Sequence, residues 1–205
     1  ATLFNYDLST TDGEECVEYL HSRGISDEIA KNMKLGFSAE RNFGGVINAK
    51  AQISALTDTR IRNRLIIPIA DEYGNIVAFS GRTIHGEEPK YLLTQETKVF
   101  RKSEILFNYS NAKSQSYGKE LFIVEGFMDV IGSKKLGIDN VVALMGTAIT
   151  SKHIELLKKL KCELVLALDN DEAGKRAMLK QIPILLQEGY RVSVIDISKV
   201  GNYKD

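Results

Sequence analysis

Hydrophobic and polar positions follow two different patterns in the two halves of the chain. From residue 119 onward, short apolar runs alternate with amphipathic segments. The runs predict strands at about 120–125, 140–144, 163–169 and 190–197. Helices are expected between them, near 127–136, 151–161 and 171–188. Pro183 should kink or interrupt the last helix. Such alternation favours a parallel sheet covered by helices on both faces.

The first half of the chain mixes helical and extended patterns. Residues 13–23 predict a short helix that ends at Gly24, and Ser26 is a suitable cap for a second helix, Asp27 to Met33. A short strand is expected near 35–37. Two further strands, 64–69 and 76–82, predict a hairpin around the turn 71–75. Residues 39–59 show no clear period, and residues 111–118 look like a polar connector.

The predicted fold is therefore α/β, with a mixed α+β N-terminal subdomain followed by a parallel sheet flanked by helices. We place the two parts at residues 1–117 and 118–205. A chain of 205 residues with 43% hydrophobic content is long enough to bury a core in each. The first residue is not Met, and the chain stops inside what looks like a motif, so we expect a piece of a longer protein.

Composition narrows the chemistry. The 27 basic and 27 acidic residues cancel, so a nucleic-acid surface would have to be local. Cys16 and Cys162 lie in no metal-like pairing and are expected to be reduced core thiols. The three histidines are expected at the surface: His21, His85 and His153. No apolar run reaches membrane-spanning length, and no P-loop motif is present.

Acidic side chains follow two of the predicted buried strands. Glu125 comes directly after one apolar run, and Asp169 and Asp171 come directly after another. Functional groups of open parallel sheets sit past the carboxyl ends of the strands. Three carboxylates that converge there repel one another unless a cation neutralises them. The oxygen-preferring ion expected is Mg²⁺, which predicts metal-dependent phosphoryl transfer.

Each of these acids also has a purely structural interpretation. Glu125 and Gly126 could simply end a strand, and Asp129 is well placed to stabilise a helix N-terminus. Asp169 and Asp171 could be a helix cap with a spare acid. We favour the structural role for Asp129 and the metal role for the other three acids taken together.

Basic residues recur in the first half. Arg60, Arg62 and Arg64 alternate, so in an extended segment all three would point the same way. Lys90 and Lys102 lie in irregular segments beside aromatic residues. These cations could hold nucleic acid, but an arginine row can equally be a solvated strand face.

The acidic motifs resemble a known family. The runs Glu125-Gly126-Phe127-Met128-Asp129 and Leu168-Asp169-Asn170-Asp171-Glu172-Ala173-Gly174 are similar to the first two motifs of the TOPRIM domain, a Mg²⁺ site of primases, topoisomerases and some nucleases. The resemblance implies a third acid-x-acid motif, of which Asp205 would be the first member. The domain would then be truncated at its C-terminal end.

The upstream half resembles one TOPRIM family in particular, the bacterial replicative DNA primase of the DnaG type. Its resemblance rests on the order of several separate motifs: Tyr19-Leu20-x-x-Arg23-Gly24-Ile25, the hairpin from Arg64 to Arg82, and Pro89-Lys90-Tyr91-Leu92 with Phe100-x-Lys102. It covers most of residues 15–205. Residues 39–59 depart from it, because the family has a longer helical insert there.

The resemblance implies a DNA-dependent RNA polymerase that makes short primers on single-stranded DNA from NTPs. The implied catalytic residues are Glu125, Asp169 and Asp171, and the implied metal ligands are these three with Asp205, holding Mg²⁺ or Mn²⁺. Gly126 and Asp129 would be secondary. The residues implied to bind nucleic acid or nucleotide are Arg23, Arg60, Arg62, Lys90 and Lys102.

Two other classes remain as alternatives: a topoisomerase or nuclease fragment, and a non-catalytic TOPRIM module that binds DNA. For the primase, zinc is expected only in a missing N-terminal domain, and a replicative helicase would bind a missing C-terminal domain. The expected location is the bacterial cytoplasm, at the replisome, with no membrane partner.

Overall fold

A computed structural model describes residues 1–39, 59–146, 148–169 and 171–195. The chain forms two compact units. The first comprises Ala1–Ile69 and Ile76–Val99, and the second comprises Ala70–Asn75 and Phe100–Asp205. Residues 100–117, which the sequence pattern joins to the first half, thus pack with the second unit in space. A functional division at residue 117 stays a prediction.

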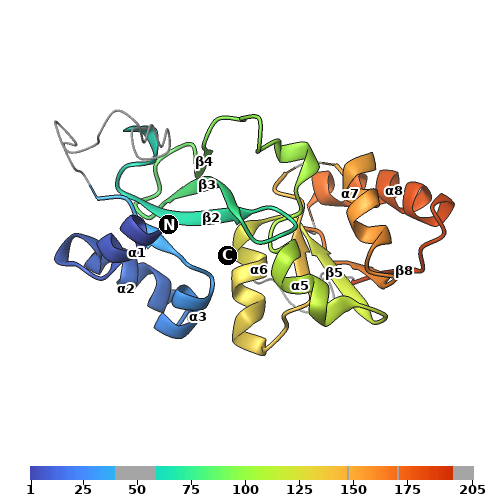
Figure 1. The fold of residues 1–205 in the computed structure, drawn as a ribbon, viewed down its shortest axis with the longest axis horizontal. Coiled ribbons are helices and arrows are strands. Elements are labelled where there is room, and N and C mark those ends of the chain that lie inside the picture. The colour runs from blue at the N-terminus through green and yellow to red at the C-terminus, as the bar shows by residue number, and fades with distance from the viewer. Residues whose placement is uncertain (40–58, 147, 170, 196–205) are drawn as a thin grey trace. The chain divides into compact units, whose positions relative to one another are not determined.

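The first unit consists of short helices and an antiparallel sheet (Figure 1). Its helices are α1 (Thr2–Leu8), α2 (Glu14–Ser22) and α3 (Asp27–Asn32), with 3-10 turns η1 (Thr11–Gly13) and η2 (Thr59–Ile61). Its strands are β1 (Gly36–Phe37), β2 (Arg64–Ala70), β3 (Ile76–Thr83) and β4 (Tyr91–Leu93), in that order across the sheet. The two predicted helices and the hairpin are confirmed.

Local signals explain the confirmed helices. Gly24 follows α2 with φ +69°, a left-handed conformation that glycine adopts at little cost. The Ser26 hydroxyl accepts a hydrogen bond from the Ile29 N–H at 3.3 Å and so caps α3. Helix α1 was not predicted, because seven residues are too few to show a helical period. It packs on β1, and its Phe4 also meets Phe79 of β3 edge-on at 5.2 Å between ring centroids.

The predicted row of arginines is wrong. The chain is not extended before residue 64: Arg60 lies in η2, and Asn63 turns the chain with φ +53°. Arg60 is exposed and Arg62 is partly buried, whereas Arg64 is buried and its Nη1 donates to the Pro89 carbonyl at 2.9 Å. Arg64 is therefore a structural residue of the sheet.

The second unit is built on a parallel sheet, as predicted. The strands are β5 (Glu120–Val124), β6 (Val141–Ala143), β7 (Glu163–Leu166) and β8 (Val192–Val194), in the order β6-β5-β7-β8 with parallel neighbours. The helices are α5 (Tyr109–Ser116), α6 (Phe127–Ser133), α7 (Ser151–Lys158) and α8 (Glu172–Gln187), with 3-10 turns η3 (Lys102–Glu104) and η4 (Lys134–Leu136).

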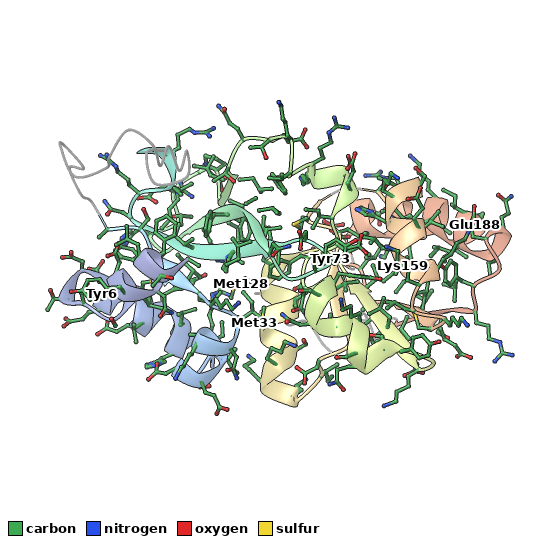
Figure 2. All side chains as sticks on the ribbon, viewed as in Figure 1. Tyr6, Met33, Tyr73, Met128, Lys159 and Glu188 are labelled. Carbon is green, nitrogen blue, oxygen red and sulfur yellow. The ribbon has the colours of Figure 1, made fainter. Side chains whose placement is uncertain are left out.

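The core of this unit lies around the two central strands. Leu121 and Ile123 of β5 and Leu164 and Leu166 of β7 are fully buried. Val165, which points to the opposite face of β7, is also buried, as expected for a strand covered on both faces. Figure 1 shows α6 apart from α7 and α8, with β5 drawn between them. Helices α7 and α8 lie side by side, because Lys158 pairs with Glu188 (labelled in Figure 2) at 2.6 Å.

The turn between β2 and β3 belongs to the second unit. Asp71 Oδ1 accepts hydrogen bonds from the Tyr73 and Asn75 N–H groups, both at 2.9 Å. Glu72 pairs with Lys159 of the segment after α7 at 2.5 Å, and Figure 2 labels Lys159 and the neighbouring Tyr73. The contact of Glu72 with Lys159 agrees with the grouping of residues 70–75 with the second unit.

Two expectations in the second unit are wrong. Residues 111–118 are not a connector, since helix α5 occupies Tyr109–Ser116. The buried face of α5 consists only of Tyr109, Ala112 and Ser116. The other positions are mostly polar, so the sequence shows no clear helical period of hydrophobic residues. The expected interruption at Pro183 is also absent, because helix α8 continues through it, and a kink there stays a prediction. Pro183 is exposed, so the carbonyl that its ring leaves without a donor can be hydrated.

Buried titratable groups correct and confirm further expectations. His153 is not at the surface but buried. Its Nδ1 accepts a hydrogen bond from the Thr150 N–H at 3.3 Å, and burial lowers the pKa of its imidazole. Cys16 and Cys162 are free and buried, as predicted, and burial raises the pKa of Cys16 to about 12. Among the described helices, none has the length and apolar character needed to cross a membrane.

Candidate active site

The carboxyl ends of β5 and β7 bring two predicted site residues together. The strands are parallel neighbours, with Ile123 opposite Leu166. Glu125 directly follows β5, and Asp169 lies three residues beyond β7. The Asp169 N–H donates to Glu125 Oε1 at 3.3 Å. Residues 44 positions apart thus meet at one edge of the sheet, as the strand pattern predicted.

Glu125 sits in a concentrated negative potential. Burial raises the pKa of its carboxyl group, and the charges of Asp169, Asp171 and Asp129 raise it further, against the lowering effect of the Asp169 N–H. The side chain is half-buried, whereas Asp169 is exposed. Such a carboxylate is stabilised by a proton or by a cation, and a perturbed acid in this position marks a functional site.

Two of the neighbouring acids also make the structural contacts considered from the sequence. Asp171 caps α8, with Oδ1 accepting from the Gly174 N–H at 2.7 Å. Asp129 in the first turn of α6 accepts from the Gly126 N–H through Oδ2 at 2.8 Å. A capping contact does not exclude a second role, because the charges of both acids also raise the pKa of Glu125.

The donor chemistry fits a hard divalent cation, but the ligands are not assembled in advance. Glu125, Asp169 and Asp171 offer carboxylate oxygens of the kind that Mg²⁺ and Mn²⁺ prefer. Within the described residues, no group of three or more His, Cys, Asp or Glu side chains is arranged to hold a metal ion. Asp205, the fourth predicted ligand, lies outside the described residues.

A pair of substitutions separates the capping role of Asp171 from a metal role. Asn is as good a cap as Asp, so Asp171→Asn should keep the free energy of unfolding, whereas Asp171→Ala should lower it by about 1 kcal/mol. Both should weaken Mg²⁺ binding, because both remove the charge. Thermal denaturation with and without Mg²⁺ measures both effects. Full Mg²⁺-dependent stabilisation in Asp171→Asn would leave Asp171 as a cap alone.

Gly174 ends the second acidic motif, but the sequence pattern assigns it no role in the site. A methyl group built on it would lie 2.9 Å from Glu125 Oε1 and would collide with the Asp169 carbonyl oxygen. Only glycine therefore allows the first turn of α8 to approach both acids. The signal in the sequence is its position five residues after Asp169, but from sequence alone it reads as an ordinary helix glycine.

The predicted basic residues are divided between the two units. Arg23, Arg60, Arg62 and Lys90 belong to the first unit and Lys102 to the second. Lys90 is exposed just before β4. Lys102 begins η3, and its Nζ would lie 3.7 Å from a methyl group built on Gly146, in the loop after β6. Lys102 is thus in the same unit as Glu125.

A buried arginine in the first unit was missed. Arg82 at the end of β3 is 3% exposed, and its Nε donates to the Tyr19 hydroxyl at 2.5 Å. Its Nη1 donates to the Tyr91 hydroxyl, and its guanidinium lies 5.0 Å from the Tyr91 ring centroid. Arg23 lies 5.1 Å from the centroid of the same Tyr19 ring. Within the described part of the chain, Arg82 has no acidic ion-pair partner.

Comparisons with known proteins agree with this architecture. Residues 3–113 match the family described as "DNA primase catalytic core, N-terminal domain", and residues 119–196 match the "Toprim domain". The DNA primase of Staphylococcus aureus (strain COL) is 37% identical over 207 residues, which cover 92% of this chain and 34% of that protein. The chain spans about a third of the length of the curated relatives that it matches.

Solved structures give the same result. A DNA primase domain from Pseudomonas aeruginosa superposes with a TM-score of 0.82 at 32% identity, over 95% of this chain and 67% of that one. A structure described as the DnaG primase catalytic domain bound to ssDNA superposes with a TM-score of 0.81 at 28% identity, over 94% of this chain and 69% of that one. The chain therefore belongs to the family of bacterial DnaG-type DNA primase catalytic cores, with the core's N-terminal domain followed by a Toprim domain.

Proposed function

We propose that this chain is the polymerase core of a DNA primase, which makes short RNA primers from NTPs on single-stranded DNA. The observation that carries the proposal is the contact of Glu125 with the Asp169 backbone, at the ends of neighbouring parallel strands. There, burial and three nearby acids raise the pKa of Glu125. Family membership supports the reaction class, and this geometry supports Glu125 as the group that performs it.

In the proposed reaction, the 3′ hydroxyl of one ribonucleotide attacks the α-phosphorus of the next. A bond forms from that oxygen to phosphorus, and the bond from phosphorus to the β-phosphate oxygen breaks, so pyrophosphate leaves. Glu125 takes or orients the hydroxyl proton, since a raised pKa makes a carboxylate a stronger base. Asp169 and Asp171, with Asp205, would hold one or two Mg²⁺ or Mn²⁺ ions, which stabilise charge on the phosphate oxygens when bound.

The proposed template is single-stranded DNA. A similar catalytic domain has been solved bound to ssDNA, which supports this partner. In this chain, Arg82 is buried and donates to the Tyr19 and Tyr91 hydroxyls, so it is proposed to orient these two rings rather than to meet a phosphate itself. Tyrosine rings next to arginines also offer stacking surfaces to unpaired bases. Arg23, Arg60, Arg62 and Lys90 are proposed to extend this surface.

Other partners belong to the longer protein. We propose that a zinc module and a helicase-binding domain flank this core in the whole chain, which works at the replication fork in the bacterial cytoplasm. The direct test of the function is primer synthesis on single-stranded DNA with labelled ribonucleotides. Mg²⁺-dependent products of a few nucleotides are expected. Cleavage of supercoiled plasmid in place of primer synthesis would support a topoisomerase or nuclease instead.

The lysines proposed to contact phosphate can be tested by salt dependence. Lys90→Ala and Lys102→Ala should weaken single-stranded DNA binding about equally for all sequences. Each should reduce the slope of log affinity against log salt by about 1, because one phosphate contact is lost. Fluorescence anisotropy at several salt concentrations measures both. Lys158→Ala is the control, since Lys158 already pairs with Glu188. An unchanged slope removes the lysine from the template path.

A further inference from the structure

A cavity of about 410 Å³ opens beside Glu125. Its wall on the sheet side consists of Glu125, Leu144 and Leu168, at or just beyond the ends of the central strands. Helix α8 forms the other wall, with Arg176, Lys180 and Gln181. All of these residues belong to the second unit. The volume is within the range of about 300–1,000 Å³ that is usual for small-ligand sites.

Two cations stand on the α8 wall. Arg176 and Lys180 are four residues apart, so they project from the same face of the helix, one turn apart. Both are exposed, and neither has an ion-pair partner among the described residues. Lys175 on the same helix differs, because it does not line the cavity and lies 3.9 Å from Glu172. The cavity therefore has an acidic side at Glu125 and a basic side on α8.

A buried amide completes the basic side. Gln181 is 3% exposed, and its Oε1 has no hydrogen-bond donor among the described residues. An unpartnered buried amide is costly to the fold, so its retention beside a cavity favours a role with a ligand. Rotation of the terminal amide group can present its N–H groups instead of its oxygen to the cavity.

We propose that this cavity holds the phosphate chain of the incoming nucleotide and the pyrophosphate that leaves it. This inference rests on the proposed function and adds residues to it: Arg176 and Lys180 bind the phosphate oxygens, and Gln181 donates to them. Two cations one helical turn apart match an anion with two phosphate groups. The position of Glu125 on the opposite wall puts the leaving phosphates next to the reacting atoms.

The test is calorimetric titration of the whole chain with inorganic pyrophosphate in the presence of Mg²⁺. Arg176→Ala and Lys180→Ala should each weaken binding by about tenfold or more, as the loss of a charge-assisted hydrogen bond predicts. Lys175→Ala is the matched control and should bind like the wild type. Gln181→Leu should also bind more weakly, without loss of melting temperature, because it removes a buried amide whose oxygen has no hydrogen-bond donor among the described residues.

Three results would overturn the inference: wild-type pyrophosphate affinity in the Arg176→Ala/Lys180→Ala double variant, an equal loss in Lys175→Ala, or orthophosphate bound as tightly as pyrophosphate. The titration contains neither template nor nucleotide, so it is read independently of primer synthesis. In the polymerase assay, the double variant should raise the KM for nucleotides and leave template affinity unchanged. A wild-type chain that binds pyrophosphate at these residues but makes no primers would count against the proposed function alone.

Discussion

Glu125→Gln should abolish primer synthesis while it preserves the fold. The amide keeps the size of the side chain and an oxygen that can accept from the Asp169 N–H, but it can neither take a proton nor carry the charge that binds a cation. Loss of a positioned general base and its metal contact is expected to lower the rate by about three orders of magnitude. Incorporation of labelled ribonucleotides on single-stranded DNA measures the loss.

The same substitution should make the metal-free protein more stable at neutral pH. Because burial and neighbouring acids raise the pKa of Glu125, the folded state binds more protons than the unfolded state in the window above the ordinary carboxyl pKa of 4.5. Stability contributed at this residue therefore falls as pH rises through that window. Gln cannot ionise, so the variant avoids the cost of a buried negative charge. The melting temperature of Glu125→Gln should therefore exceed that of the wild type near pH 7, and the difference should disappear near pH 4.

Mg²⁺ should reverse the order of the two melting temperatures, so that the wild type melts above Glu125→Gln. A cation offsets the repulsion among the carboxylates, so it should raise the melting temperature of the wild type and have little effect on Glu125→Gln. Template affinity, measured by anisotropy, is the control for an intact fold. If Glu125→Gln unfolds, or melts below the wild type without metal, Glu125 stabilises the structure and the catalytic assignment is wrong.

Gly174→Ala should damage the site through geometry alone. A methyl group there would lie 2.9 Å from Glu125 Oε1 and would collide with the Asp169 carbonyl, so the segment after β7 or the first turn of α8 has to shift. Overpacking of this kind costs about 1–3 kcal/mol of folding free energy. A displacement of about 1 Å at reacting groups can lower the rate by about two orders of magnitude. Denaturation and primer synthesis measure the two effects.

Gly132→Ala is the matched control. Gly132 lies in α6 of the same unit, and a methyl group built there meets nothing within 4 Å. Alanine in a helix is favoured over glycine by about 0.5–1 kcal/mol, so this variant should be slightly more stable and fully active. If Gly174→Ala behaves like Gly132→Ala, the close approach of α8 to the two acids does not matter for catalysis.

The ends of the strands in the second unit could be predicted because each strand is encoded by a continuous stretch of the sequence. Buried parallel strands show as continuous apolar runs, and neighbouring parallel strands carry their ends to one edge. Glu125 and Asp169 were therefore placed correctly from the runs Leu121–Val124 and Leu164–Leu168. The choice of acids as metal ligands had a different source, the resemblance to a family, and remains a proposal.

The features that were missed depend on packing between distant residues. Gly174 matters because of Glu125, 49 positions away in the sequence, and no local pattern encodes that contact. Arg82 is held by Tyr19, which is 63 residues distant. The prediction that Arg60, Arg62 and Arg64 point the same way was wrong for a local reason, because Asn63 turns the chain before β2 begins. Helix α5 was missed because only one narrow face of it is buried.

Under the proposed function, Glu125 and the acids after β7 bind a divalent cation for nucleotidyl transfer. Titration of the chain with Mn²⁺, followed by the electron paramagnetic resonance signal of the free ion, tests it most directly. We predict saturable binding by the wild type that weakens by about tenfold or more in Glu125→Gln and in Asp169→Asn, as loss of a ligand charge implies. Equal Mn²⁺ binding by the wild type and both variants would mean that these acids do not hold the ion.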